Sequence, residues 1–265
     1  MNRSSAFSRF ASVSLAIATL VLAACAHQSP KAGGGQAVAW SNASQMIVVT
    51  TADWNADNGT LRTYVKTQDG GWRADGDSIP VTIGRNGSAW GLGLHPQPIQ
   101  ADAPVKREGD GRAPAGVFAI GEAFGYGERA ETALPYAQMR DTNWCMDVPA
   151  SPLYNRIVDA KQVGEAAVEG SSEPMRLDLH NSGDQRYKNG FVIEHNREGR
   201  AGAGSCIFAH LWKAPGQTTA GCTAMAEPAM QRLYAWLRPE AHPVFVLLPQ
   251  NEYDRLKTTW QLPAP

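Results

Sequence analysis

The residues best suited to chemistry lie between positions 204 and 225, where His210 precedes the run Thr219-Ala220-Gly221-Cys222. A thiolate can attack a carbonyl carbon, so a nucleophilic cysteine needs a base or a cation close by. A glycine before the cysteine lets the backbone approach a substrate and turn its N–H groups toward a developing oxyanion. The pattern is therefore compatible with a nucleophilic cysteine at Cys222, with His210 upstream of it in the chain.

Other interpretations of these residues stay open. A buried cysteine in a tight glycine turn gives the same pattern, because free cysteines are among the most buried residue types. His195, with Asn196 beside it, is a second candidate for the base, although a histidine at a strand end often only bonds a nearby carbonyl. Thr219 is expected to order the turn or the substrate.

The walls of a substrate pocket also have candidates. Trp90, Trp144 and Trp212 are expected to exclude water, although core packing explains each of them equally well. Arg85, and with it Lys106 or Arg107, could receive substrate carboxylates, although surface charges are usually just solvated.

The first residues have the composition of a secretory signal peptide. Arg3 and Arg9 precede a short apolar run at 11–24, which is too short to span a bilayer comfortably. The run ends in Leu22-Ala23-Ala24-Cys25, which resembles a bacterial lipobox, so Cys25 is expected to carry lipid. Ala26 follows where Asp would signal inner-membrane retention, and the resemblance therefore implies a periplasm-facing lipoprotein of the outer membrane. Residues 1–24 are predicted as signal peptide, 25–44 as a flexible tether and 45–265 as the catalytic domain.

Four cysteines, Cys25, Cys145, Cys206 and Cys222, would lie in an oxidising compartment after export. If Cys25 carries lipid and Cys222 stays free, Cys145 and Cys206 remain as a disulfide pair. The rival pairing of Cys206 with Cys222 would remove the nucleophile. No zinc-type spacing of paired cysteines appears, and neither a metal nor an organic cofactor is expected.

Composition favours one mainly β domain of about 220 residues. The chain has 26 Gly, 17 Pro and 8 Trp, which suits short strands and many turns. Its net charge is −1 with 18% charged residues, so a nucleic-acid partner has little support.

Short runs bounded by turn residues predict the strands, with hairpin turns at 57–59 and 69–71. The predicted strands are 46–51, 61–66, 79–83, 89–94, 116–120, 191–195, 205–211 and 244–249. One helix is predicted at 228–237, because Pro228 suits a first turn and apolar residues recur at helical spacing. A shorter helix is expected after Asn251. The fold class is therefore α+β, mainly β, with one or two peripheral helices.

Several of these segments together resemble the YkuD-type L,D-transpeptidases. The resemblance rests on Gly204–His210 followed by Thr219–Met225, on Gly84–Gly87 with Ala89–Gly93, and on Lys106–Gly111 leading to Ala113–Gly116. Trp144 and Ser151–Asn155 are also similar, so the likeness spans residues 46–249. Ala113 stands where the family usually has threonine.

The resemblance implies an exported enzyme with a β-sandwich-like domain that acts on peptidoglycan stem peptides. The cysteine would attack the carbonyl of the L-centre of the diamino acid at position three and release the terminal D-alanine. The thioester would then pass to an amine of a neighbouring stem. Carried over by position, Cys222 is the nucleophile, His210 the base and Thr219 the family's Ser/Thr. The backbone N–H groups of Gly221 and Cys222 are then the predicted oxyanion donors.

The chain departs from the family pattern in two ways. The connection from His210 to Cys222 is shorter than is common, which leaves room for His195 as the base. Thr223 and Ala224 replace residues that usually hold the substrate, which leaves the details of the substrate open. Transfer to water, as in an L,D-carboxypeptidase or a hydrolase that releases wall-attached proteins, is an alternative. A non-catalytic lipoprotein that binds the cell wall is another.

Overall fold

The start of the folded unit lies earlier in the chain than predicted. The computed structural model describes residues 38–96 and 102–264, all within the compact unit Gln36–Pro265. The predicted signal peptide, Cys25 and most of the predicted tether lie outside the described residues. However, Trp40 and Ala43 are buried, and the Trp40 indole N–H donates to the Trp260 carbonyl at 3.2 Å. The prediction of a flexible tether reaching residue 44 was therefore wrong for its last residues.

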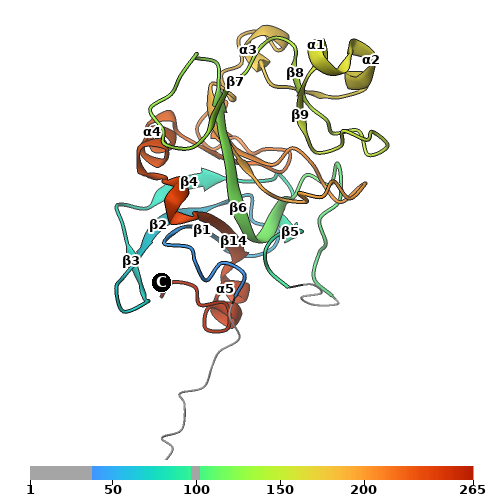
Figure 1. Ribbon diagram of the computed structural model, residues 1–265. Helices are drawn as coiled ribbons and strands as arrows, with labels where there is room; N and C mark the ends of the chain where they lie inside the picture. Colours follow the sequence, from blue (N-terminus) through green and yellow to red (C-terminus); the bar gives the residue numbers. More distant parts are fainter. Residues whose placement is uncertain (1–37, 97–101, 265) are drawn as a thin grey trace, which may run out of the picture. The chain divides into compact units, whose positions relative to one another are not determined.

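A closed sheet forms the frame of the unit (Figure 1). The ring consists, in order, of β1 (Gln45–Thr51), β14 (Val244–Pro249), β6 (Ala113–Gly125), β11 (Asn189–Ile193), β12 (Phe208–Leu211), β13 (Thr223–Met225), β4 (Ile79–Thr82) and β2 (Asn58–Lys66). It closes because β1 pairs in parallel with β14 and antiparallel with β2. β3 (Trp72–Ala74) extends β2, while β5 (Ser88–Trp90) and β7 (Tyr136–Gln138) pair with β6. The mainly β prediction is confirmed.

Strand composition explains where the core lies. Every residue of β14 is buried, as its continuous apolar run Val244–Pro249 predicts for a strand with neighbours on both sides. The predicted turn at 57–59 was wrong, because Asn58 and Gly59 already belong to β2. The predicted strand at 205–211 begins only at Phe208, since Cys206 has a left-handed backbone with φ 56°.

Helices are few and peripheral. α4 (Glu227–Trp236) and α5 (Gln250–Leu256) match the two predicted helices, and η1 (Pro239–Ala241) is a single 3-10 turn. α4 buries Met230, Leu233 and Tyr234, the apolar stripe that its spacing predicted. None of the helices within residues 38–96 and 102–264 has both the length and the apolar character of a membrane span.

A small second sheet lies in the long segment between β7 and β11. Its order is β10 (Glu173–Pro174), β8 (Asn143–Cys145) and β9 (Ile157–Asp159). The short helices α1 (Ala160–Val163), α2 (Glu165–Val168) and α3 (Leu177–His180) lie at this end of the unit, and α5 lies at the other (Figure 1). A disulfide joins Cys145 of β8 to Cys206 before β12, with 5.9 Å between the Cα atoms. The predicted pairing is confirmed, and the rival Cys206–Cys222 bond is excluded.

Removing this disulfide is expected to lower stability clearly. The bond spans 61 residues, and a loop of that length corresponds to about 4 kcal/mol of unfolded-state entropy. We therefore expect Cys145→Ser to lower Tm by roughly 10 °C in a domain of this size. Thermal unfolding of the wild type and the variant, with and without a dithiol reductant, measures the effect. An equal Tm for all four samples would contradict it.

Candidate active site

Cys222 lies directly before β13, beside the strand that carries His210. β12 and β13 pair in parallel, with Ala209 opposite Thr223 and His210 opposite Ala224. The Phe208 N–H donates to the Cys222 Sγ at 3.3 Å, and the thiol donates to the Cys206 carbonyl at 3.4 Å. Cys222 is only 8% exposed, and it is the one free cysteine among the described residues.

The turn before the nucleophile is held by Thr219. Its hydroxyl donates to the Cys222 carbonyl at 2.7 Å and accepts from the Gly221 N–H at 3.1 Å. Thr219 therefore orders the turn, which was one of its two predicted roles. Gly221 is needed for space as well, because a Cβ there would lie 3.0 Å from the Arg112 carbonyl oxygen.

This turn changes the predicted oxyanion hole. The Gly221 N–H is already bonded to Thr219, so only one of the two predicted donors stays available in this state. The Cys222 N–H makes no hydrogen bond to any other part of the chain that the structure describes. The backbone N–H of Cys222 is therefore the donor that is free to stabilise a developing oxyanion.

The ring of His210 is fixed on one side. Its Nδ1 lies 2.6 Å from the Leu211 carbonyl oxygen, and because a carbonyl can only accept a hydrogen bond, Nδ1 carries the hydrogen. The Nε2 atom is then the basic nitrogen. The Tyr187 ring packs edge-on against His210, with 5.2 Å between the ring centres. Burial lowers the pKa of His210 to about 4, so the imidazole is neutral at physiological pH.

Both members of the predicted pair line one cavity of about 580 Å³. Four of the predicted site residues, Cys222, His210, Thr219 and Gly221, meet there, and Arg85 joins them as a candidate for carboxylates. The same cavity is lined by three carboxylates, which are those of Glu108, Asp147 and Glu173. Besides Arg85, two more cationic side chains line it, Lys106 and Arg186.

The thiol is protonated in the free protein. Burial, and next the charge of Glu173, raise the pKa of Cys222 to about 12. His210 is not among the groups that shift the pKa of this thiol in the unliganded state. A neutral thiol that shares a cavity with a neutral imidazole can still react, if the proton moves to His210 as the sulfur attacks.

Alkylation of Cys222 is expected to be slow at neutral pH. Iodoacetamide reacts with thiolate, and a pKa of about 12 in place of about 8.5 leaves about three thousandfold less thiolate at pH 7. The rate should rise about tenfold per pH unit from pH 7 to 10. Mass spectrometry of the Cys222 peptide against a free cysteine peptide measures it. A plateau between pH 6 and 8 would show that the thiol is already ionised.

His195 does not belong to this cavity. Its Nδ1 accepts from the Leu92 N–H at 3.1 Å, and its Nε2 donates to the Ala203 carbonyl at 2.9 Å. The side-chain amide of Asn196 likewise donates to two carbonyls of its own loop. Both residues hold loops together, and His195 as base is not supported.

The predicted tryptophan walls also lie elsewhere. Trp90 is buried and packs against Trp54 and Trp260. Trp144 packs on His180, and neither Trp144 nor Trp212 lines the cavity. None of the three tryptophans therefore forms a wall of the cavity that holds Cys222.

Three cavity residues escaped sequence reasoning: Glu173, Tyr187 and Arg186. The Tyr187 hydroxyl donates to the Glu173 carboxylate, while Arg186 pairs with Asp184 at 2.8 Å. No periodicity or motif marks them, since they lie in the irregular segment between β7 and β11. Only the pairing of β10 with β8 brings Glu173 to the site.

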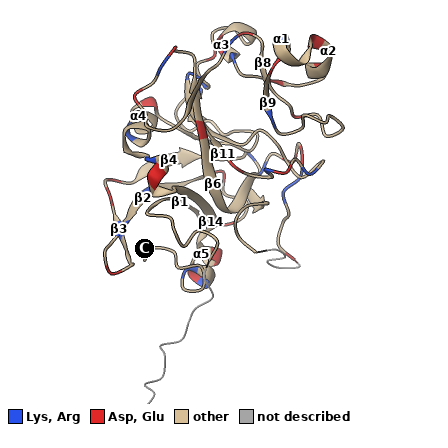
Figure 2. Cartoon of the chain, in the orientation of Figure 1, with Lys and Arg blue, Asp and Glu red and all other residues tan. Residues whose placement is uncertain are grey.

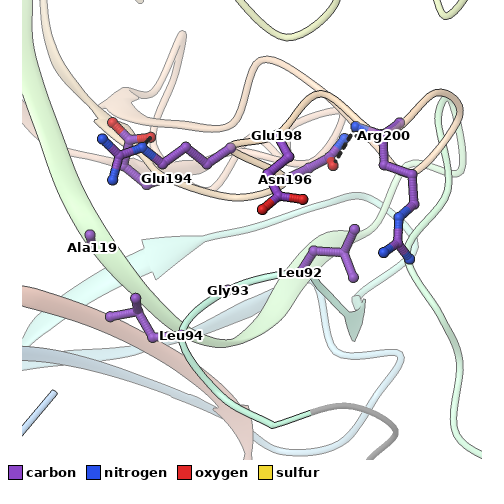
Figure 3. Close-up of a pocket in the computed structure, with 9 residues that line it drawn as sticks. Leu92, Gly93, Leu94, Ala119, Glu194, Asn196, Glu198 and Arg200 are labelled. Atoms are coloured by element: carbon purple, nitrogen blue, oxygen red, sulfur yellow. Dashed lines mark hydrogen bonds and ion pairs between the residues drawn. The ribbon is translucent and has the colours of Figure 1, made fainter. Parts of the chain in front are cut away.

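A second pocket, of about 310 Å³, differs in chemistry from the first. Leu92 and Leu94 form one side of it, and Glu194, Asn196 and Glu198 lie across from them (Figure 3). No cysteine or histidine is among its lining residues. Acidic and basic residues are interspersed along the chain (Figure 2). No group of three or more His, Cys, Asp or Glu that could hold a metal was found in residues 38–96 and 102–264.

Comparison with known proteins identifies no relative of this chain. No family model, no curated protein and no solved structure matches the chain.

Proposed function

We propose that this protein is a cysteine acyltransferase of the L,D-transpeptidase type that acts on peptidoglycan stem peptides. One observation carries the proposal: the free thiol of Cys222 shares a cavity with His210, whose Nδ1 is tied to a backbone carbonyl. That arrangement combines a nucleophile, a neutral base with its basic nitrogen defined, and an unpaired backbone N–H.

The first half-reaction follows from these groups. The Cys222 sulfur attacks the carbonyl of the diamino acid at position three, and its proton passes to Nε2 of His210. The Cys222 N–H stabilises the oxyanion, which supplies a few kcal/mol of the barrier reduction. The tetrahedral intermediate then expels the terminal D-alanine, which takes the proton from His210 and leaves a thioester.

The second half-reaction uses the same residues in reverse. An amine of a neighbouring stem attacks the thioester, and His210 accepts its proton. The proton then returns to the departing sulfur, so that the thiol is regenerated and a cross-link is formed. Arg85 is exposed at the cavity, and no described acidic residue forms a salt bridge with it. It is the candidate for a carboxylate of the substrate.

The cell envelope fits this function. We propose that the described unit is a YkuD-like domain, exported by residues 1–24 and anchored through Cys25 on the periplasmic side of the outer membrane. The Cys145–Cys206 disulfide agrees with an oxidising compartment.

Purified protein incubated with tetrapeptide-bearing muropeptides tests the proposal. Cross-linked dimers that contain the diamino-acid linkage are the expected product, and they should be absent with Cys222→Ala. Trimmed monomers without dimers would indicate water as the acceptor, and thus an L,D-carboxypeptidase. Neither product, with the protein shown to be folded, would contradict the enzymatic function.

A further inference from the structure

Glu173 is linked to the nucleophile through a short series of contacts. It lies opposite Cys145 in the pairing of β10 with β8. Cys145 is bonded to Cys206, and the Cys206 carbonyl accepts the hydrogen bond of the Cys222 thiol. The Glu173 side chain lines the same cavity as the sulfur. The disulfide therefore fixes this carboxylate in relation to the thiol.

Glu173 is also the cavity carboxylate that is least satisfied. One oxygen accepts from the Tyr187 hydroxyl, and the other has no hydrogen-bond partner among the described residues. Glu108, in contrast, accepts from Tyr154 and, at 2.6 Å, from Ser205, and Asp147 accepts from the backbone and hydroxyl of Ser172.

The cations of the cavity do not neutralise Glu173. Lys106 pairs with Asp110 at 2.6 Å, and Arg186 pairs with Asp184. None of the ion pairs in the described part of the chain includes Glu173. Glu173 is half-buried, and a partly desolvated carboxylate is stabilised when a cation pairs with it, so this position suits a cationic group of a ligand.

We infer that Glu173 binds a primary ammonium group of the acyl donor and so selects donors that carry an ammonium near the scissile carbonyl. The inference rests on the proposed function. Tyr187 positions the carboxylate through its hydrogen bond, and Arg85 faces the same cavity to receive an accompanying carboxylate. A diamino acid with a free distal centre carries both charges.

Binding of the ammonium also activates the nucleophile. Burial raises the pKa of Glu173 itself to about 7, and the negative charge that Glu173 carries above that pH raises the pKa of Cys222, because it disfavours a second negative charge nearby. An ammonium paired with Glu173 cancels that charge, so the pKa of the thiol falls and its thiolate fraction grows. Donors without the ammonium leave the thiol protonated, and it then reacts more slowly.

Glu173→Gln tests the selection directly, because glutamine keeps an oxygen for the Tyr187 hydroxyl but removes the charge. Two tetrapeptide donors are compared, one with diaminopimelate at position three and one with 2-aminopimelate, which lacks only the distal amine. We expect the wild type to prefer the first by about tenfold or more in kcat/KM, and Glu173→Gln to lose that preference. Asp147→Asn, which removes a different charge of the cavity, should keep it. A wild type without preference, or a variant that is slower on both donors by the same factor, would overturn the inference.

A second measurement does not depend on turnover. The rate of Cys222 alkylation is followed with Nα-acetyl-lysine methylamide or its norleucine analogue, with the Cys222 peptide identified by mass spectrometry. The lysine compound should accelerate alkylation several-fold in the wild type and not in Glu173→Gln, and norleucine should do so in neither. If neither donor is turned over, the proposed function fails while this result still decides the role of Glu173. No acceleration, or equal acceleration in both proteins, would refute that role.

Discussion

Cys222→Ala is expected to abolish acyl transfer while leaving the domain folded. The substitution removes the only sulfur in the described residues that can form a thioester, and loss of a nucleophile costs on the order of 10⁵-fold or more in kcat. The structural loss is small in comparison. One sulfur atom and its weak hydrogen bonds to Phe208 and Cys206 correspond to about 1–2 kcal/mol. Dimer formation from muropeptides and the Tm of the same preparation measure the two effects.

Cys222→Ser is the matched control for this experiment. Serine keeps the size of the side chain and a hydrogen-bonding atom for Phe208 and Cys206, so its stability should be close to that of the wild type. Its hydroxyl is a far weaker nucleophile, and its activity should fall nearly as far as that of alanine. A structural cysteine gives the opposite result: activity would persist in both variants, and the alanine variant would melt much earlier.

Local patterns in the sequence predicted most of the frame. Alternating and continuous apolar runs located most strands of the ring, and the spacing of Met230, Leu233 and Tyr234 located α4. The pairing of Cys145 with Cys206 was predicted by counting, because a lipid on Cys25 and a free thiol at Cys222 leave only these two of the four cysteines. These predictions depend on neighbours in the chain, which sequence shows directly.

The rest of the site depends on contacts between distant segments. Glu173 and Tyr187 meet His210 and Cys222 only because β10 pairs with β8 and the disulfide holds β8 to the segment before β12, whose Cys206 carbonyl accepts from the Cys222 thiol. Residue type alone also misled the prediction for Trp90, because an aromatic side chain fills a core as readily as it lines a pocket. The protonation of Cys222 could not be predicted either, since it depends on burial and on a carboxylate from another sheet.

Substitutions of His210 and His195 are expected to separate an effect on catalysis from an effect on stability. His210→Ala is expected to lower kcat by about 10²- to 10⁴-fold, because it removes the base that accepts the thiol proton. Added imidazole should restore part of the activity, since the deleted ring leaves space beside the cavity. In the wild type, kcat/KM should fall as pH drops through about 4, because the pKa of His210 lies there and the protonated ring cannot accept the proton.

His195→Ala is the matched comparison, since burial likewise lowers the pKa of His195 to about 4. Both ring nitrogens of His195 satisfy buried backbone groups, so its loss should cost about 1–3 kcal/mol of stability for each partner left unpaired. The kcat of the folded fraction should stay within a few-fold of the wild type, and imidazole should have no effect on it. Measuring kcat, imidazole rescue and Tm for both variants separates the two roles. If His195→Ala lost activity and regained it with imidazole while His210→Ala only melted earlier, the base would be His195. In that case the hydrogen bond from Nδ1 of His210 to the Leu211 carbonyl would only stabilise β12.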